Sequence, residues 1–154
     1  MLKWLWLTVL VIVLDQLTKW GMSSWLSLHE SVAVIPMFNL TLAHNTGAAF
    51  SFLAQSSGWQ RWFFIGLAVT ISVVLLIWLA RLKPHAKLEA VALTMILGGA
   101  LGNVIDRVHL GYVIDFLDFY VNNYHWPAFN VADSAICIGA ILLLIDSLRS
   151  KSEQ

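Results

Sequence analysis

The sequence has few charged residues. Only 12% of its 154 residues are Asp, Glu, Lys or Arg, whereas about a quarter of a typical soluble domain is charged. Hydrophobic residues make up 59% of the chain, and the mean hydropathy is +0.76. These values argue against a soluble protein and predict an integral membrane protein. The length fits one domain, residues 1–154.

The sequence also lacks a basic excess, a cysteine pair and a metal motif. Nine basic residues balance nine acidic ones, so nothing suggests nucleic-acid binding. The single cysteine, Cys137, cannot form an internal disulfide, and the five histidines show no paired metal-ligand spacing. No serine lies in a nucleophile-elbow pattern. Catalysis by Lys19 with a serine of the first long loop stays open as a minor alternative.

No cleavage site closes the first hydrophobic run. A secretory signal peptide ends in a site of small residues, but the run that begins at Trp4 passes instead into the polar stretch Asp15–Lys19. We therefore interpret the run as a membrane helix of the mature protein.

Four apolar segments are long enough to cross a membrane, which takes about 17–25 residues. They are about Trp4–Met22, Trp59–Ala80, Leu88–Ile105 and Val131–Leu148. Six of the nine basic residues lie before the first segment, between the second and third, or after the fourth. These six are Lys3, Arg81, Lys83, Lys87, Arg149 and Lys151. Cytoplasmic loops carry most of the Lys and Arg, so we expect both termini to be cytoplasmic.

The two longer connections, 23–58 and 108–129, contain no Lys or Arg and are expected outside. Val32–Pro36 and Met37–Leu42 read as short strands, and Asn45–Phe50 reads as a turn in which Gly47 permits a positive φ. The second loop is rich in aromatic residues, which favour the membrane interface, and part of it is expected to form an interfacial helix. The predicted fold is an all-α polytopic membrane protein with four transmembrane helices, a small extracytoplasmic β-sheet and an outer interfacial loop or helix.

Polar residues gather at the outer ends of three segments. Asp15 and Lys19 have the i,i+4 spacing of a helical ion pair, which could be structural or could also order a site. Gly98 and Gly102 form a small-xxx-small pair that lets another helix approach closely.

On the same segment, Asn103 and Arg107 share one helix face, where they could bind carboxylates or peptide carbonyls. Alternatively, Asp106 pairs with Arg107 as an interfacial anchor, and the spacing alone does not decide between the two interpretations. Asn130 is a good N-cap for the last segment, and Asp133 falls at N3, where an acid is favourable even without a catalytic role.

Asp133 and Asp115 are nevertheless tied to one membrane surface by a short loop. Two carboxylates held close can share one proton, so that one acts as a base toward water and the other as an acid. Asp118 lies in the same loop, and these chemical arguments alone do not separate it from Asp115.

Five sequence blocks occur together in a fixed order. They are Asp15–Lys19, Asn45–Phe50, Gly98–Arg107, Val113–Phe116 and Pro127–Ile136. Across essentially the whole chain, these blocks resemble the bacterial lipoprotein signal peptidase family (signal peptidase II), with no departure at the motif positions.

The resemblance implies an aspartyl peptidase of the bacterial inner membrane that cuts prolipoproteins just before a diacylglyceryl-modified cysteine. It assigns the catalytic pair to Asp115 and Asp133, and so favours Asp115 over Asp118. The residues expected to support the pair or bind substrate are Asp15, Lys19, Asn45, Gly47, Asn103, Arg107, Asn130 and Ala132. The expected partners are diacylglyceryl prolipoprotein signal peptides, membrane lipids and globomycin-type inhibitors. No metal, organic cofactor or nucleic acid is expected.

Two other classes remain as alternatives: a small ion or proton transporter with paired membrane carboxylates, and a purely structural membrane subunit. A transporter would need polar residues through the depth of its helices. Here they cluster toward one surface, which favours the peptidase.

Overall fold

The computed structural model describes residues 1–47 and 58–152, with side chains as far as Arg149. Within this part, four helices are long and apolar enough to cross a membrane. They are α1 (Leu5–Trp25, preceded by a 3-10 turn at Leu2–Trp4), α2 (Trp59–Arg81), α3 (Lys87–His109) and α4 (Val131–Ser152). The four predicted spans are confirmed. Each begins within one residue of the expected position and runs one to four residues past its expected end.

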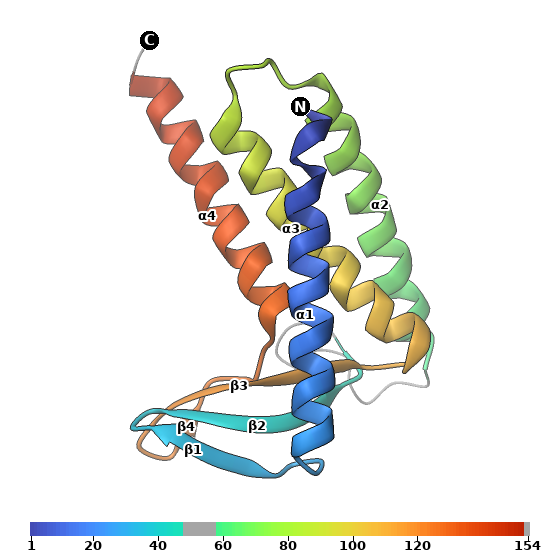
Figure 1. The fold of residues 1–154 in the computed structure, drawn as a ribbon, viewed down its shortest axis with the longest axis vertical. Helices are drawn as coiled ribbons and strands as arrows, with labels where there is room; N and C mark the ends of the chain where they lie inside the picture. Colours follow the sequence, from blue (N-terminus) through green and yellow to red (C-terminus); the bar gives the residue numbers. More distant parts are fainter. Residues whose placement is uncertain (48–57, 153–154) are drawn as a thin grey trace.

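Helix α3 lies in the middle of the bundle and packs against each of the other three helices (Figure 1). In the most apolar stretch of α3, 50% of the residues are buried. The corresponding values for α1, α2 and α4 are 22%, 17% and 17%. The outer helices leave large apolar side chains such as Trp62, Val74 and Leu148 exposed. Apolar side chains on the outside of a bundle are what a lipid environment favours.

Three glycines of α3 let its neighbours approach closely. A Cβ at Gly98 would lie 2.7 Å from Val11 Cβ of α1, and one at Gly99 would overlap the Ala132 carbonyl oxygen of α4. A Cβ at Gly102 would lie 2.6 Å from an oxygen of Asp15. The predicted small-residue packing is confirmed, and Gly99 extends it to a second face of α3.

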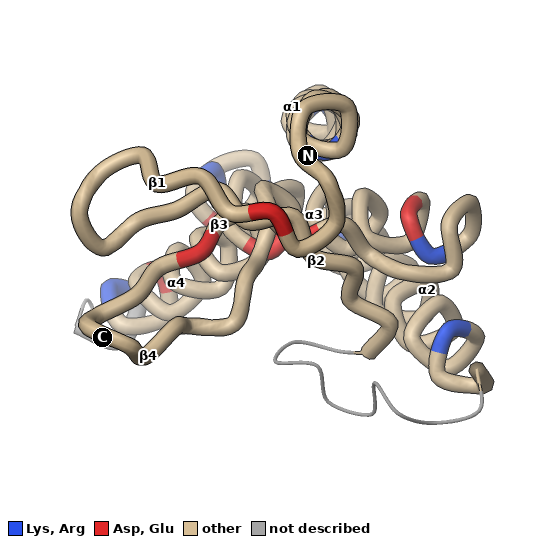
Figure 2. Tube along the Cα trace, turned by 90° about the horizontal axis from the view of Figure 1, so that it is seen from below, with Lys and Arg blue, Asp and Glu red and all other residues tan. Residues whose placement is uncertain are grey.

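An antiparallel sheet in the order β1-β2-β3-β4 crosses one end of the bundle, opposite the start of α1 and the end of α4 (Figure 1). Its strands are β1 (Ser31–Ile35), β2 (Phe38–Asn45), β3 (Val113–Val121) and β4 (Tyr124–His125). Seen from that end, the sheet spreads sideways past α4, and acidic positions lie along β3 (Figure 2). The two predicted strands of the first loop are confirmed.

The expected interfacial helix in the second loop is wrong, because this segment forms β3 and β4. The sequence of β3, Val-Ile-Asp-Phe-Leu-Asp-Phe-Tyr-Val, is rich in β-branched and aromatic residues, which favour strands. Its backbone pairs with β2, with Asn45 opposite Val113 and Ala43 opposite Asp115. Leu42 and Phe116 then pack the sheet against Leu26, just beyond the end of α1.

Candidate active site

Asp115 and Asp133 line the same cavity, which has a volume of about 640 Å³. Asp115 comes from β3 and is 2% exposed, and Asp133 comes from the first turn of α4. Away from the carboxylates, the cavity is lined mainly by apolar side chains of α2, α3 and α4. The fold therefore brings the two predicted carboxylates to one end of a largely apolar chamber.

Asparagine side chains donate to both oxygens of Asp115. Asn130 Nδ2 donates to Asp115 Oδ1 over 2.7 Å, and Asn45 Nδ2 donates to Asp115 Oδ2 over 3.0 Å. Asn45 lies at the end of β2, opposite the first residue of β3. The sheet register therefore holds Asn45 beside Asp115.

Both oxygens of Asp133 also accept hydrogen bonds. Asn103 Nδ2 donates to Asp133 Oδ1 over 2.8 Å, and the backbone N–H of Asn130 donates to Asp133 Oδ2 over 3.2 Å. In return, Asn130 Oδ1 accepts from the Asp133 N–H over 2.9 Å. This reciprocal pair confirms Asn130 as the N-cap. Asp133 is thus both the N3 partner of the cap and the catalytic candidate, so the two interpretations of Asp133 are compatible.

A buried ion cluster joins α1 to α3 behind the carboxylates. Lys19 Nζ lies 2.8 Å from Asp15 Oδ2 and 2.9 Å from Asp106 Oδ2, and all three side chains are at most 3% exposed. The predicted Asp15–Lys19 pair is confirmed, but the expected Asp106–Arg107 pair is wrong. Consecutive side chains on a helix do not share a face, so Asp106 points to α1 while Arg107 points to the cavity.

Asp15 also fixes the start of α4. Its Oδ1 accepts the backbone N–H of Ala132 over 2.9 Å, and Ala132 is fully buried. Ala132 therefore contributes through its backbone and its small size, since Gly99 and Gly102 of α3 pack against it.

Arg107 connects α3 to the end of β2. Its Nη2 donates to the Gly47 carbonyl over 2.7 Å, and its guanidinium lies over the ring of Phe64 at 5.3 Å. The N–H of Gly47 in turn donates to Asn45 Oδ1 over 3.0 Å. Gly47 therefore contacts Arg107 and Asn45, and of these two residues Asn45 reaches Asp115, while residues 48–50 of the predicted turn lie outside the described residues.

Asp118 occupies a different place from Asp115. Three residues apart on a strand, the two side chains leave opposite faces. Asp118 accepts hydrogen bonds from Thr41 over 2.9 Å and lies 2.8 Å from His125 Nδ1. It does not line the cavity of Asp115 and Asp133.

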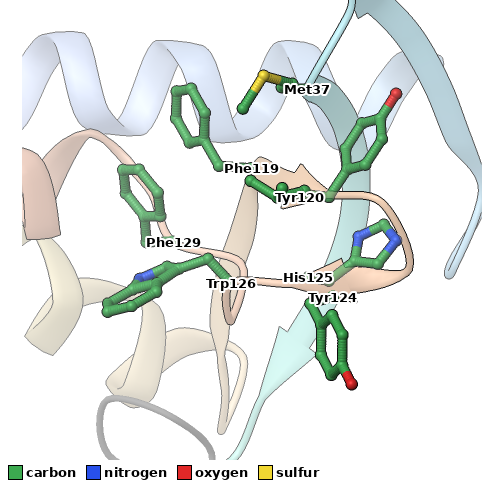
Figure 3. A pocket seen from close by; sticks show the side chains of 8 residues that line it. Met37, Phe119, Tyr120, Tyr124, His125, Trp126 and Phe129 are labelled. Carbon is green, nitrogen blue, oxygen red and sulfur yellow. The ribbon is translucent and has the colours of Figure 1, made fainter.

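A second cavity, of about 540 Å³, lies around the end of β3 and the strand β4, and is lined mainly by aromatic rings. Figure 3 shows the side chains of Phe119, Trp126 and Phe129 around it, with His125 and Tyr124 on β4. Trp126 and Phe129 line both cavities. The connection between β4 and α4, which contains Trp126 and Phe129, thus forms part of the wall of the carboxylate site.

Sequence reasoning missed Gln16 and Phe64. Gln16 Nε2 donates to Asp106 Oδ1 over 2.8 Å and lies 3.2 Å from Asp15 Oδ2, so it belongs to the ion cluster. Its place beside Asp15, on a helix that must bury its polar groups, could have indicated this. Phe64 is one apolar residue among many in α2, and no local signal marks it as a partner of Arg107.

No group of three or more His, Cys, Asp or Glu side chains in residues 1–47 and 58–152 is arranged to hold a metal ion. The carboxylates, amides and one guanidinium that these residues bring to the cavity are joined there by the Ser134 hydroxyl and the Cys137 thiol. Such a set can bind a peptide backbone and transfer protons to and from it.

Burial raises the pKa of Asp115 from 3.8 to about 7, and the nearby negative charge of Asp133 adds to this effect. The hydrogen bonds from Asn45 and Asn130 act in the opposite direction and lower the pKa. Asp115 therefore holds a proton at pH values where an exposed aspartate has lost it.

This pKa makes stability depend on pH. Between pH 3.8 and about 7, folded Asp115 is protonated more than unfolded Asp115. Its contribution to the free energy of unfolding is therefore largest below this range and is lost as the pH rises through 7. Thermal unfolding in detergent should show this decline in the wild type and a smaller decline in Asp115→Asn. The same pH dependence in both proteins would contradict the assignment.

The sequence model of the signal peptidase (SPase) II family matches residues 7–149. The lipoprotein signal peptidase of Alteromonas mediterranea is 57% identical over 156 residues, which cover 99% of this chain and 86% of that protein. The lipoprotein signal peptidase of Pseudomonas aeruginosa is 55% identical over 152 residues, which cover 97% of this chain and 90% of that protein.

A solved structure of a bacterial membrane enzyme, determined by the in meso method at 2.3 Å, has the same fold. It superimposes with a TM-score of 0.86 at 35% identity, covering 99% of this chain and 91% of that one. The sequence match and the structural match both extend over nearly the whole chain. The chain therefore belongs to the signal peptidase II family.

Proposed function

We propose that Asp115 and Asp133 are the catalytic pair with which this aspartic peptidase removes signal peptides from prolipoproteins. One observation carries the proposal: both carboxylates line one cavity, and each of their four oxygens accepts a hydrogen bond from an N–H group. Such an arrangement holds both acids at one cavity and leaves lone pairs on their oxygens for a reacting group.

The two carboxylates are suited to different roles. Burial raises the pKa of Asp115 to about 7, which suits this residue to hold the shared proton. Asp133 lies at the start of α4, where backbone N–H groups and the helix dipole stabilise a negative charge. Asp133 takes a proton from water, and the water oxygen attacks the scissile carbonyl carbon. Asp115 donates its proton to the carbonyl oxygen. When the C–N bond breaks, the amine takes the proton from Asp133, and the carbonyl oxygen returns its proton to Asp115.

The cavity suits a substrate with long apolar groups. From the carboxylates it extends along α2, α3 and α4, past Leu67, Ile71, Ile96 and Ile136. A diacylglyceryl-modified cysteine with its signal helix would place acyl chains and apolar side chains there. Asn103 and Arg107 would orient the peptide backbone. Trp126 and Phe129, in the connection between β4 and α4, would cover it from the sheet side. We therefore propose cleavage just before the lipidated cysteine.

The four spans make this a multi-pass membrane protein. We propose that it lies in the bacterial inner membrane with both termini cytoplasmic and the sheet at the outer leaflet. The distribution of Lys and Arg supports this orientation, because six of the nine lie on the side of the termini. A diacylglyceryl group anchored in the outer leaflet would then meet the carboxylates at its own depth.

A purified protein should cleave a diacylglyceryl-modified prolipoprotein, and mass spectrometry should find the lipidated cysteine at the new N-terminus. The same prolipoprotein without the diacylglyceryl group is the matched control. It should be cleaved at least about tenfold more slowly, since lost apolar burial of even a few methylenes costs about 1–3 kcal/mol. Globomycin should block both reactions. Equal cleavage of both substrates would contradict the proposed lipid recognition, and no cleavage of either would contradict the catalytic proposal.

A further inference from the structure

Three asparagine side chains donate to the carboxylate pair, and in each the carbonyl oxygen is held by a group that can only donate. The Asp133 N–H holds Asn130 Oδ1 at 2.9 Å, and the Gly47 N–H holds Asn45 Oδ1 at 3.0 Å. Lys19 Nζ holds Asn103 Oδ1 at 3.0 Å. An ammonium or a backbone N–H has no acceptor, so each contact fixes which end of the amide faces the carboxylates.

Asn103 differs from the other two, because the group that fixes it is a distant side chain. Lys19 is 84 positions away in the sequence and lies on another helix. Asn103 Oδ1 also accepts a longer contact of 3.2 Å from Asn130 Nδ2, but the two N–H groups of that amide are shared with Asp115 Oδ1 at 2.7 Å and the Ile114 carbonyl at 3.2 Å. Lys19 is therefore the main constraint on the direction of the Asn103 amide.

Lys19 uses all three of its donors inside the protein. They point to Asp15 Oδ2, Asp106 Oδ2 and Asn103 Oδ1, at 2.8, 2.9 and 3.0 Å. Lys19 is 2% exposed and does not line the cavity of Asp115 and Asp133. It therefore has two routes to the reaction: its hydrogen bond to Asn103, and its positive charge, which acts on Asp115 across space and lowers the pKa of that carboxyl.

We propose that Lys19 is a positioning residue for peptide cleavage, which holds Asn103 in the one orientation whose NH₂ group donates to Asp133. This inference rests on the proposed function of Asp115 and Asp133 as the catalytic pair. Without Lys19, only the longer contact from Asn130 holds Asn103 Oδ1, and the amide can turn over and set its oxygen against Asp133. The carboxylate would then lose a donor and gain a repulsive contact, while the cavity that binds substrate keeps its lining.

Two substitutions of Lys19 separate this positioning role from a general effect of its positive charge. Both replacement side chains are neutral and similar in length, so the charge is lost equally in the two variants. Lys19→Gln keeps an N–H donor for Asn103 Oδ1, and Lys19→Met has none. We expect kcat of Lys19→Met to fall at least about tenfold below that of Lys19→Gln, the scale of one hydrogen bond to a charged group. KM should stay within about twofold in both. Equal kcat values for the two variants would overturn the proposal.

Either variant leaves Asp15 and Asp106 without a buried cation, so the comparison is repeated in an Asp106→Asn background. There the cluster keeps its original net charge: one positive and two negative side chains give −1, and Asp15 alone also gives −1. Thermal unfolding identifies the folded variants. If no Lys19 variant folds in either background, Lys19 acts on the fold as a whole and the positioning role is overturned.

Thr8→Val is the matched structural control. Thr8 Oγ1 donates to the Thr94 carbonyl over 2.9 Å, so it also joins α1 to α3 by a buried hydrogen bond, away from the carboxylates. This variant should lower the unfolding temperature and leave kcat unchanged. Asp133→Asn separates the two proposals: if it cleaves normally, the catalytic pair is wrong. If it is inactive while Lys19→Gln and Lys19→Met match, only the role of Lys19 is wrong.

Discussion

Asp115→Asn and Asp133→Asn should each lower kcat for prolipoprotein cleavage by about 10³-fold or more, in the range of losing a general acid or base. An asparagine keeps the shape of the aspartate but cannot accept or release the proton that the reaction transfers. In Asp115→Asn, the new NH₂ group would also face the NH₂ group of Asn45 or Asn130, since these donate to both oxygens of Asp115. The measurement is steady-state cleavage of a diacylglyceryl substrate.

Asp118→Asn is the control for this experiment, because Asp118 lies on the same strand and is also buried. Its partners, Thr41 and His125, belong to the sheet and not to the cavity of Asp115 and Asp133. This variant should keep kcat within about threefold of the wild type, as expected for a group that transfers no proton. A loss equal to that of Asp115→Asn would show that the catalytic pair has been assigned wrongly.

Gly99→Ala should have the second largest effect. The new methyl group would overlap the Ala132 carbonyl oxygen and lie 2.7 Å from Ile136 Cγ1. Helices α3 and α4 would have to separate where Asn103 meets Asp133 at 2.8 Å. A displacement of about 1 Å can cost about 100-fold in rate, and overpacking costs about 1–3 kcal/mol of stability. We therefore expect kcat to fall about 100-fold, together with a lower unfolding temperature.

Gly66→Ala is the matched control, since Gly66 lies inside α2 and, apart from its own helix, no atom of the described residues would come within 4 Å of its added Cβ. Alanine is a better helix former than glycine, so this variant should be as stable as the wild type or more so, with unchanged kcat. If Gly99→Ala behaved like Gly66→Ala, the close approach of α3 and α4 would not determine the geometry of the site.

The spans could be predicted from the sequence because burial in lipid leaves a long apolar run. The Asp15–Lys19 pair and the Asn130 cap could be predicted because both are local helix patterns. The contacts of Lys19 with Asn103 and Asp106 could not, since they depend on how α1 packs against α3. Without that packing, Asp106 was assigned to its neighbour Arg107.

The second outer loop shows a different limit of sequence reasoning. Its aromatic residues are typical of a membrane interface, and this composition outweighed the strand-forming pattern of Val113–Val121. The expected interfacial helix was therefore wrong. The choice between Asp115 and Asp118 needed a family resemblance. In the structure the two differ plainly, because successive side chains of a strand leave opposite faces.

We propose above all that Asp115 and Asp133 cleave prolipoproteins at the membrane surface opposite both termini. The most direct test reconstitutes the protein in liposomes and adds the diacylglyceryl substrate only from outside. Protease removal of a C-terminal tag measures how many molecules have each orientation. We expect the initial cleavage rate to follow the fraction of molecules whose tag lies inside, and vesicles with Asp115→Asn or Asp133→Asn to cleave at least about 10³-fold more slowly. A rate that follows the exposed tag, or cleavage by either variant at the wild-type rate, would contradict this placement of the catalytic pair.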